Sequence, residues 1–357
     1  MSAQNPTSYK QIIYAERPDP AIIPDKTFKV QTASLPSSLR PNELLVRAHY
    51  LSLDAAMRSW LTAKRSYIAP VEINSVMRGY TIAQVLDTGA AVPRTKFKKG
   101  DWVTATTGWT EYAVIQDKWA DKVDVPAGCT PLDFMSVLGM TALTAYFGLE
   151  EIGNVQPGET VVVSGAAGAT GSVAGQIAKI KGGRVIGIAG GKDKCDFLTS
   201  SLGFDAAVDY KDPNWRQRLR ELTPKYIDVY FDNVGGDILD ACLARAAKDS
   251  RFVICGAISQ YNAATPKGPA NILNVISQRI TLKGFIVMDY ADRYDEARKV
   301  LAKWLTEGKL QRKEHIVTGG LEKAPAALVD LYAGGNTGKM LVEIAPLSEA
   351  LPGNAKL

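Results

Sequence analysis

The sequence predicts an α/β protein with two domains, a small β-barrel and a doubly wound parallel sheet with helices on both faces. Three observations carry this prediction. The chain has 357 residues, which is enough for two hydrophobic cores. Short strand patterns fill its first third, and strand and helix patterns alternate through its middle. A glycine-rich turn follows the first strand of the alternating part.

The N-terminal region, up to about Pro131, consists of short strand patterns separated by turns. Residues 43–50, 82–86, 101–105 and 111–115 each show the apolar and β-branched composition of a short strand. No helical periodicity of comparable length interrupts them. We therefore expect a small, irregular β-barrel in this part of the chain.

From Leu132 to about Leu305, strand and helix patterns alternate, which predicts a parallel sheet covered by helices on both faces. The predicted strands are residues 160–164, 184–189, 206–208, 227–232, 251–255 and 281–287. The predicted helices are residues 172–181, 192–202, 215–222, 238–247, 272–279 and 298–310. A last strand at 339–344 fits best in the barrel. We assign residues 1–134 and 308–357 to the barrel domain and 135–307 to the sheet domain.

The glycine-rich turn lies between the predicted strand 160–164 and the helix that follows. It contains Gly165, Gly168 and Gly171, and Ala166 stands where the pattern G-x-G-x-x-G has its first glycine. A strand, tight turn and helix direct the unpaired N–H groups of the helix towards a phosphate. Such turns also occur without a ligand, so the pattern indicates a dinucleotide site only together with its context.

The end of the second strand indicates which dinucleotide binds. In an NAD site, an Asp or Glu at this end would bond the adenosine ribose hydroxyls. Here the chain continues with Gly190, Gly191, Lys192, Asp193 and Lys194, with no acid at the strand end. A nearby ammonium favours a ribose 2′-phosphate, so we predict NADPH/NADP+. The alternative is that Lys192 and Lys194 are solvated residues in the first turn of the next helix.

Composition excludes several other classes of protein. The hydrophobic content of 46% and charged content of 22% are typical of a soluble globular protein. The net charge of +5 comes from scattered basic residues, so we expect no nucleic-acid partner. No apolar run reaches about 18 residues, and the N-terminal residues lack a signal-peptide core. We therefore expect a cytoplasmic protein that does not insert into a membrane.

Cysteine and histidine usage and one terminal tripeptide carry further information. The four cysteines form no C-x-x-C pair and the chain has two histidines, so we expect reduced thiols and no zinc. The final residues Ala355, Lys356 and Leu357 are similar to the Ser-Lys-Leu peroxisomal address. Peroxisomal import and coincidence both remain open for a motif this short.

The order of several motifs resembles a known family. They include Tyr50-Leu51-Ser52-Leu53-Asp54, Gly139-Met140-Thr141-Ala142-Leu143-Thr144-Ala145-Tyr146, Phe231-Asp232-Asn233-Val234-Gly235-Gly236 and Cys255-Gly256-Ala257-Ile258-Ser259-Gln260-Tyr261-Asn262. With the glycine-rich turn, they resemble the medium-chain dehydrogenases/reductases, which combine a GroES-like β-barrel catalytic domain with a Rossmann domain. Within that family the chain is similar to the zinc-independent alkenal double-bond reductases, the branch of the leukotriene/prostaglandin and curcumin reductases.

The resemblance implies a set of cofactor-binding residues. Lys194 and Tyr210 would hold the 2′-phosphate, and Asn233 would face the cofactor riboses. The segment from Cys255 to Tyr261 would line the nicotinamide, and Asn336 would reach the cofactor from the barrel side. The pyrophosphate would lie on the turn formed by Gly168, Ala169, Thr170 and Gly171. A second apolar segment, formed by Phe285, Ile286 and Val287, would complete the nicotinamide site.

The resemblance also bears on metal binding and on the substrate. The zinc-ligand positions of related dehydrogenases fall at Leu51, Tyr80 and Met140, which gives no plausible zinc site. Many members of the branch have Pro-Tyr-Met-Arg where this chain has Ala55-Ala56-Met57-Arg58. The substrate-facing tyrosine is therefore missing at Ala56, which should enlarge the pocket.

Four residues are expected to shape the substrate pocket, and two tyrosines are candidate catalytic residues. The pocket residues are Ala56, Met57, Tyr67 and Met140, although Met57, Tyr67 and Met140 could equally be ordinary core residues. Tyr261 is the hydrogen-bond donor that the family match suggests for the substrate oxygen, and Tyr80 could supply a compensating phenol. The alternatives are that Tyr261 packs beside the nicotinamide and that Tyr80 fills space in a strand.

These observations predict an NADP-dependent oxidoreductase acting on a small electrophilic carbonyl compound. The expected reaction is hydride transfer to the C=C bond of α,β-unsaturated aldehydes or ketones, with the enolate stabilised by a tyrosine and a cofactor hydroxyl and no metal. Ketone reduction or quinone reduction on the same fold are alternatives, and so is a cofactor-binding protein with little turnover. The resemblance also implies a homodimer.

Overall fold

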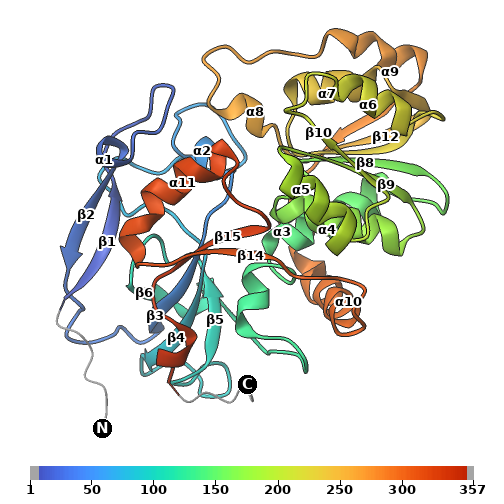
Figure 1. Cartoon of the computed structure of the whole chain (residues 1–357). Coiled ribbons are helices and arrows are strands. Elements are labelled where there is room, and N and C mark those ends of the chain that lie inside the picture. Colours follow the sequence, from blue (N-terminus) through green and yellow to red (C-terminus); the bar gives the residue numbers. More distant parts are fainter. Residues whose placement is uncertain (1–7, 352–357) are drawn as a thin grey trace. The chain divides into compact units, whose positions relative to one another are not determined.

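The computed structural model describes residues 8–351 and divides them into two compact units. The first unit comprises residues 8–135, 315–335 and 340–351, and the second comprises 136–314 and 336–339. Relative to the domain ranges expected from the sequence, the segments 308–314 and 336–339 group with the second unit. Each unit has its own sheets and helices, which Figure 1 shows.

The first unit is built mainly from antiparallel strands. Its main sheet has the strand order β14-β15-β3-β4-β5-β7, and β6 pairs with β3 beside this path. The strands are β3 (Glu43–Ser52), β4 (Thr81–Thr88), β5 (Trp102–Ala105), β6 (Tyr112–Gln116), β7 (Ala120–Lys122), β14 (Glu314–Val317) and β15 (Lys339–Glu343). A separate hairpin is formed by β1 (Tyr9–Tyr14) and β2 (Phe28–Ala33). The predicted strands of this region are confirmed.

Short helices and an apolar core complete the first unit. The helices are α1 (Pro24–Thr27), α2 (Met57–Trp60) and α11 (Ala324–Ala333). Leu44, Val46, Val85 and Val103 from three strands are fully buried in one cluster. Each of these strands turns apolar side chains to this core, which is why short strand patterns were visible in the sequence.

The second unit contains a six-stranded sheet with the order β10-β9-β8-β11-β12-β13, and its strand pairs are parallel. The strands are β8 (Thr160–Ser164), β9 (Arg184–Ala189), β10 (Ala206–Asp209), β11 (Ile227–Asp232), β12 (Ala246–Ile254) and β13 (Thr281–Gly284). This is the strand order of a Rossmann domain, and the direction of winding reverses between β8 and β11. The predicted doubly wound sheet is confirmed. Ligands bind such sheets at the carboxyl ends of the strands beside this reversal.

Helices cover both faces of this sheet, as Figure 1 shows. On one face, α6 (Trp215–Leu222) and α7 (Gly236–Leu243) contribute Trp215, Leu219 and Cys242 to a core with Val162 and Tyr230. On the other face, α4 (Ala169–Ile180) packs on β8 and β9 and lies beside α3 (Met140–Gly148). The remaining helices are α5 (Lys192–Asp196), α8 (Ile258–Tyr261), α9 (Asn274–Ser277) and α10 (Tyr294–Thr306).

Several expected elements end earlier in the structure than predicted; the helices expected at 272–279 and 298–310, for example, end at Ser277 and Thr306. The helix expected at 238–247 ends at Leu243, because β12 already begins at Ala246. The strand expected at 281–287 ends at Gly284, and the apolar residues after it lead into a 3₁₀ segment at Val287–Arg293. The helix is shortened because strand pairing starts at Ala246, and the strand is shortened because its pairing with β12 ends at Gly284.

Two further features of the described residues concern helix length and the cysteines. Within residues 8–351, no helix has both the length and the apolar character that a bilayer crossing requires. The cysteines at 129, 195, 242 and 255 are all free thiols. The terminal tripeptide Ala355 to Leu357 lies outside the described residues.

His49 on β3 is a titratable group enclosed in the first unit. Its side chain has no exposed surface, and its Nδ1 lies 3.2 Å from the carbonyl oxygen of Ala345. The ring packs edge-on against Trp102, with a centroid distance of 4.9 Å. Burial, helped by the nearby Arg47 charge, lowers the pKa of His49 to about 4.

We predict that His49 makes the first unit sensitive to acid. Because its pKa is depressed in the folded state, its contribution to stability is complete above the ordinary pKa of about 6.5 and is lost as the pH falls towards 4. Going from pH 7 to pH 5 should therefore cost about 2 kcal/mol. Urea unfolding followed by tryptophan fluorescence measures this. His49→Asn should flatten the dependence, and an unchanged slope in that variant would contradict the assignment.

Candidate functional site

The glycine-rich turn joins β8 to α4 through a tightly packed backbone. Gly165 has a φ of 56°, and a Cβ on Gly171 would lie 2.3 Å from the carbonyl oxygen of Gly165. Glycine is therefore required at 171, because the helix starts in contact with the turn. Ala166 is fully buried, and its N–H donates to Ile188 at 3.0 Å. The alanine is tolerated because the positive φ falls on Gly165 instead.

The N-terminus of α4 suits a bound phosphate. Gly168 is the N-cap residue, and no side chain caps this helix of 12 residues in the structure. The first N–H groups of such a helix point out of its end and favour an anion. The turn formed by Gly168, Ala169, Thr170 and Gly171 can therefore hold a pyrophosphate.

A short segment from the C-terminal part of the chain lies against this turn. The N–H of Gly338 donates to the carbonyl of Ala167 at 2.7 Å, and Gly338 forms a parallel bridge with Gly168. The side-chain amide of Asn336 donates to the Gly338 carbonyl at 2.7 Å. The structure therefore places Asn336 in the second unit, next to the phosphate turn.

The end of β9 has the features expected of a site for a ribose 2′-phosphate. A Cβ on Gly190 would lie 2.8 Å from the Tyr210 ring, so the ring rests against this glycine; the side chain of Tyr210 is 41% exposed. Lys194 is partly buried in α5. Lys192, in contrast, is exposed and pairs with Asp196.

Asp209 is an acidic residue close to this site, but its carboxylate is engaged with backbone N–H groups. Its Oδ1 accepts the N–H of Gly191 at 2.8 Å and the N–H of Lys211 at 2.9 Å. The carboxylate therefore shapes the loop between β9 and α5, where Gly191 has a φ of 99°. Since this oxygen is already engaged with two backbone donors, Asp209 is not arranged like the ribose-binding acid of an NAD site.

The buried carboxylate of Asp232 joins the loops at the carboxyl ends of the strands. Asp232 is 1% exposed, and its Oδ1 accepts hydrogen bonds from Ser164 Oγ at 2.9 Å and Tyr230 Oη at 2.8 Å. The same oxygen accepts the N–H groups of Val234 at 3.0 Å and Gly235 at 2.9 Å. Burial raises the pKa of Asp232, and these four donors oppose that shift by stabilising the anion.

The backbone around Asp232 extends the connection to the next loop. Its carbonyl oxygen accepts the N–H groups of Cys255 at 2.9 Å and Gly256 at 3.0 Å. Asn233 donates two hydrogen bonds to Ser164. Its backbone N–H donates to Ser164 Oγ at 2.9 Å, and its side-chain amide donates to the Ser164 carbonyl oxygen at 2.7 Å. Three predicted cofactor-binding loops therefore share one hydrogen-bonded centre.

Tyr261 has a defined place in the third of these loops. Its hydroxyl oxygen accepts the N–H of Ala257 at 3.1 Å, and a Cβ on Gly256 would lie 3.1 Å from it. A hydroxyl that accepts from a backbone N–H is polarised and becomes a better donor. Burial raises the pKa of the Cys255 thiol to about 12, so this thiol is neutral and not a nucleophile.

The segment after β13 is held mainly by the Phe285 ring and by the backbone carbonyl of Val287. A Cβ on Gly148 would lie 2.8 Å from the Phe285 ring, so that ring packs on α3. Val287 accepts a hydrogen bond from the Tyr294 hydroxyl at 3.1 Å. Phe285, Ile286 and Val287 are each partly exposed, which leaves part of this segment accessible.

The predicted substrate residues lie in both units. Ala56 is the N-cap of α2, Met57 is fully buried, and Tyr67 is 49% exposed. Tyr80 is partly buried, and its carbonyl accepts the N–H of Ser52 at 2.9 Å. These four residues belong to the first unit, whereas Met140 begins α3 in the second.

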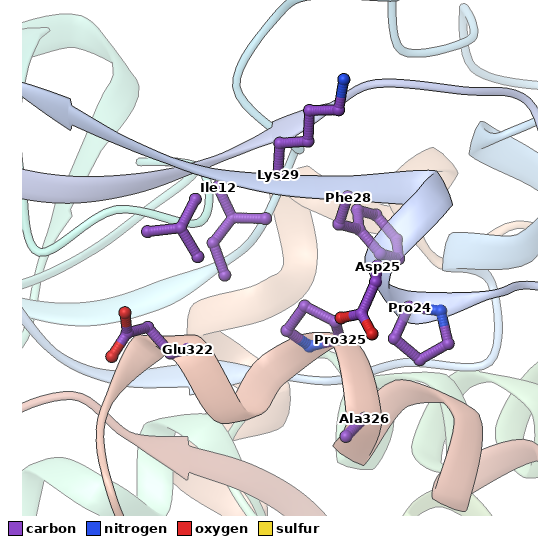
Figure 2. A pocket seen from close by; sticks show the side chains of 9 residues that line it. Ile12, Pro24, Asp25, Phe28, Lys29, Glu322, Pro325 and Ala326 are labelled. Atoms are coloured by element: carbon purple, nitrogen blue, oxygen red, sulfur yellow. The ribbon is translucent and has the colours of Figure 1, made fainter.

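A cavity in the first unit contains none of these residues. It measures about 380 Å³ and is lined by the β1–β2 hairpin, α1 and α11, as Figure 2 shows. Its walls mix apolar side chains such as Ile12 and Phe28 with the charged Asp25 and Glu322. In the described part of the chain, no three His, Cys, Asp or Glu side chains gather as a metal site would require.

The sequence reasoning missed Asp232 and Ser164 as determinants of the site. A signal was present, because each is a polar residue that ends a run of apolar strand residues at the carboxyl edge of the sheet. Such residues are well placed to organise the loops that follow. The hydrogen bond between them joins residues 68 positions apart, which no local pattern reveals.

Comparison with known proteins identifies the family of this chain. Residues 10–123 match the family described as the N-terminal domain of oxidoreductase, and residues 169–304 match the family described as zinc-binding dehydrogenase. The chain is 37% identical to the NADPH-dependent curcumin reductase of Escherichia coli (strain K12), covering 93% of this chain and 96% of the relative. It is 39% identical to the 2-alkenal reductase (NADP(+)-dependent) of Nicotiana tabacum, covering 90% and 93%.

A solved structure gives the same result. The crystal structure of CurA in complex with NADPH from Vibrio vulnificus is 40% identical, covers 94% of this chain and 99% of its own, and superposes with a TM-score of 0.87. The chain belongs to the medium-chain dehydrogenase/reductase family, in the branch of the alkenal double-bond and curcumin reductases. It is an NADP-dependent oxidoreductase, and the predicted cofactor is confirmed.

We predict that removing the Asp232 carboxylate disconnects the loops. Asp232→Ala leaves Ser164, Tyr230 and two backbone N–H groups without their acceptor, which should lower the free energy of unfolding by about 3 kcal/mol or more. The dissociation constant for NADPH, measured by fluorescence titration, should rise at least about tenfold.

Asp228→Ala is the matched control on the same strand. Its Oδ2 accepts the N–H of Thr160 at 2.8 Å, at the opposite end of β11. We expect this variant to lose about 1 kcal/mol of stability and to keep its affinity for NADPH. Equal effects of the two variants on NADPH binding would refute a special role for Asp232.

Proposed function

We propose that this oxidoreductase transfers hydride from NADPH to the C=C bond of α,β-unsaturated aldehydes and ketones. The observation that carries the proposal is the set of three loops held by Asp232, which brings the phosphate turn and the Tyr261 loop to one edge of the sheet. The names of the curcumin and 2-alkenal reductases to which the chain is similar support the same reaction.

The reaction requires a group that stabilises charge on the substrate oxygen. NADPH supplies the hydride to the β-carbon, and an enolate oxygen then carries the negative charge. A placed hydrogen-bond donor is worth about 3–4 kcal/mol in such a step. We assign this donor to Tyr261, whose hydroxyl is polarised by the Ala257 N–H, with a hydroxyl of the cofactor as the second donor.

Roles for the remaining predicted residues follow from this assignment. Gly168, Ala169, Thr170 and Gly171 bind the pyrophosphate; Lys194 and Tyr210 bind the 2′-phosphate; Asn233, Cys255, Phe285, Ile286, Val287 and Asn336 line the cofactor. Ala56, Met57, Tyr67 and Met140 shape the substrate side. Tyr80 supplies a second phenol in place of the tyrosine missing at Ala56. No metal takes part.

Product analysis tests the reaction directly. An enone incubated with NADPH should give the saturated ketone, identified by mass spectrometry and NMR. The altered pocket at Ala56 favours ketone reduction as the second candidate, and this would give an allylic alcohol instead. In the same assay, Tyr261→Phe should lower kcat at least about tenfold. If Tyr80→Phe leaves kcat unchanged, Tyr80 only packs.

Cofactor selectivity tests the role of Lys194. We expect Lys194→Ala to raise the dissociation constant for NADPH at least about tenfold while changing that for NADH little, because only NADPH carries the 2′-phosphate. Lys192→Ala is the matched control, since Lys192 is exposed and paired with Asp196. Equal losses for both cofactors in Lys194→Ala would remove this assignment.

We also propose that two copies associate along β13. All four residues of this edge strand are exposed, and nearby Leu273 and Ile276 are 72% and 75% exposed. An unpaired strand edge beside an apolar patch is suited to pairing with a second chain. Light scattering should give the mass of a dimer, and Ile276→Lys should shift it towards the monomer. An unchanged mass in this variant would argue against this surface.

A further inference from the structure

The carboxyl ends of β9 and β10 lie side by side, and one side chain links the segments that follow them. The two strands pair in parallel, with Asp209 next to Ala189. The chain continues from β9 into Gly190 and Gly191, and from β10 into Tyr210. Asp209 is the last residue of β10, and its Oδ1 accepts the N–H of Gly191 at 2.8 Å. This hydrogen bond therefore joins the two walls of the candidate 2′-phosphate site.

The same oxygen fixes the turn on which Tyr210 lies. Oδ1 of Asp209 accepts the N–H of Lys211 at 2.9 Å, which is the pattern of an Asx turn. The N–H of Asp212 donates to the carbonyl oxygen of Asp209 at 3.1 Å, so a backbone hydrogen bond closes the same turn. The N–H of Tyr210 donates to the carbonyl oxygen of Ala189 at 3.0 Å. The position of Tyr210 therefore depends on a turn that the Asp209 carboxylate stabilises.

The glycines opposite this turn need an external partner to hold them in one conformation. Gly191 has a φ of 99°, and a Cβ on it would meet no atom within 4 Å, so its backbone angle alone calls for glycine. A Cβ on Gly190 would lie 2.8 Å from the Tyr210 ring. Two consecutive glycines have many accessible conformations. The hydrogen bond to Asp209 selects the one in which the ring can rest against Gly190.

The carboxylate also brings a negative charge close to a site for an anion. Among the ion pairs of residues 8–351, none includes Asp209. Burial raises the pKa of the Cys195 thiol to about 11, and the charges of Asp209 and Asp196 add to this shift. Because Cys195 follows Lys194 in the chain, the Asp209 charge is felt beside the ammonium assigned to the phosphate. That charge repels a phosphate, so only the hydrogen-bond acceptor can favour binding.

We propose that Asp209 is a positioning residue that sets the preference for NADPH over NADH, by holding the Gly190–Gly191 backbone and the Tyr210 ring where they receive the 2′-phosphate. The inference rests on the roles of Lys194 and Tyr210 given under the proposed function. Asp209 acts through the Gly191 N–H and the turn that carries Tyr210. Its loss should therefore weaken the binding of NADPH and spare that of NADH, which has no 2′-phosphate.

Two variants of Asp209 separate the acceptor from the charge, with dissociation constants measured by fluorescence titration. Asp209→Ala removes the acceptor and should raise the dissociation constant for NADPH at least about tenfold, and that for NADH less than about twofold. Asp209→Asn keeps an acceptor oxygen without the charge, so its dissociation constant for NADPH should stay within about threefold of the wild type or fall below it. Asp212→Ala is the matched control, because Asp212 Oδ1 accepts the N–H of Asn214 at 2.8 Å in the following turn. It should leave both values unchanged.

Gly191→Ala tests the proposal from the other end of the hydrogen bond. Alanine rarely adopts a φ of 99°, so the backbone must move away from Asp209, and the selective loss of NADPH should be reproduced. Gly203→Ala is the matched control. Gly203 has a φ of 71°, a Cβ on it would meet no atom within 4 Å, and it precedes β10, whereas Asp209 ends that strand. This variant carries a similar backbone strain and should keep the preference for NADPH.

Three results would overturn the proposal. An equal weakening of NADPH and NADH in Asp209→Ala would show a structural role only. An Asp209→Asn variant as defective as Asp209→Ala would show that the acceptor is not what matters. If Asp209→Ala does not fold, Gly191→Ala decides in its place, and a preference for NADPH that survives in that variant would contradict the proposal.

Fragments of the cofactor separate this inference from the proposed function. 2′,5′-ADP carries the 2′-phosphate and 5′-AMP does not, and neither can transfer hydride, so calorimetry with them is independent of the reaction. The wild type should prefer 2′,5′-ADP, and Asp209→Ala should lose most of that preference. If Asp209→Ala loses it while Lys194→Ala keeps it, the proposed role of Lys194 fails and that of Asp209 stands. If Lys194→Ala loses it while Asp209→Ala keeps it, the inference about Asp209 fails alone.

Discussion

The site depends on one buried carboxylate. Asp232 lies at the carboxyl end of the central strand β11, where the winding of the sheet reverses, and its Oδ1 accepts four hydrogen bonds. Its Oδ2 has no partner among the described residues. A buried carboxylate with one unsatisfied oxygen is costly. The cost is offset because the other oxygen and the main-chain carbonyl hold together loops that would otherwise move independently.

The tight contacts around this centre explain the choice of small residues. Gly171 allows α4 to begin against the carbonyl of Gly165, and Gly190 allows the Tyr210 ring to lie against the end of β9. Gly256 likewise leaves room for the Tyr261 hydroxyl. Each close approach exposes backbone N–H groups or an aromatic face at the sheet edge where a dinucleotide binds in this fold. The site is therefore a property of backbone packing as much as of side chains.

Local patterns were sufficient for much of the fold, and long-range contacts account for what they missed. The strands at 160–164, 184–189 and 227–232 match β8, β9 and β11 because buried parallel strands are continuous apolar runs. The hairpin of β1 and β2 was not predicted, since its exposed faces dilute the apolar pattern. The helix α11 was not predicted either, because its sequence is almost uniformly apolar and therefore shows no helical period. The strand expected at 281–287 was too long because pairing with β12, not composition, ends it at Gly284.

The candidate site was likewise predicted in part from local patterns, and the rest depends on long-range contacts. The turn at Gly168–Gly171 and the missing acid after β9 were visible in the sequence, and they identified the cofactor. The network of Asp232 and Ser164, and the contact of Gly338 with Ala167, join segments that are far apart in the chain and could be found only in the structure.

Hydrogen–deuterium exchange with and without NADPH tests the central claim most directly. Because Asp232 couples the loops, NADPH should slow exchange together in the peptides that contain residues 164–171, 233–235 and 255–261. Asp232→Ala, studied at a saturating concentration of NADPH, should protect the first of these peptides without the other two. Protection confined to one loop in the wild type, or identical patterns in the two proteins, would contradict the account.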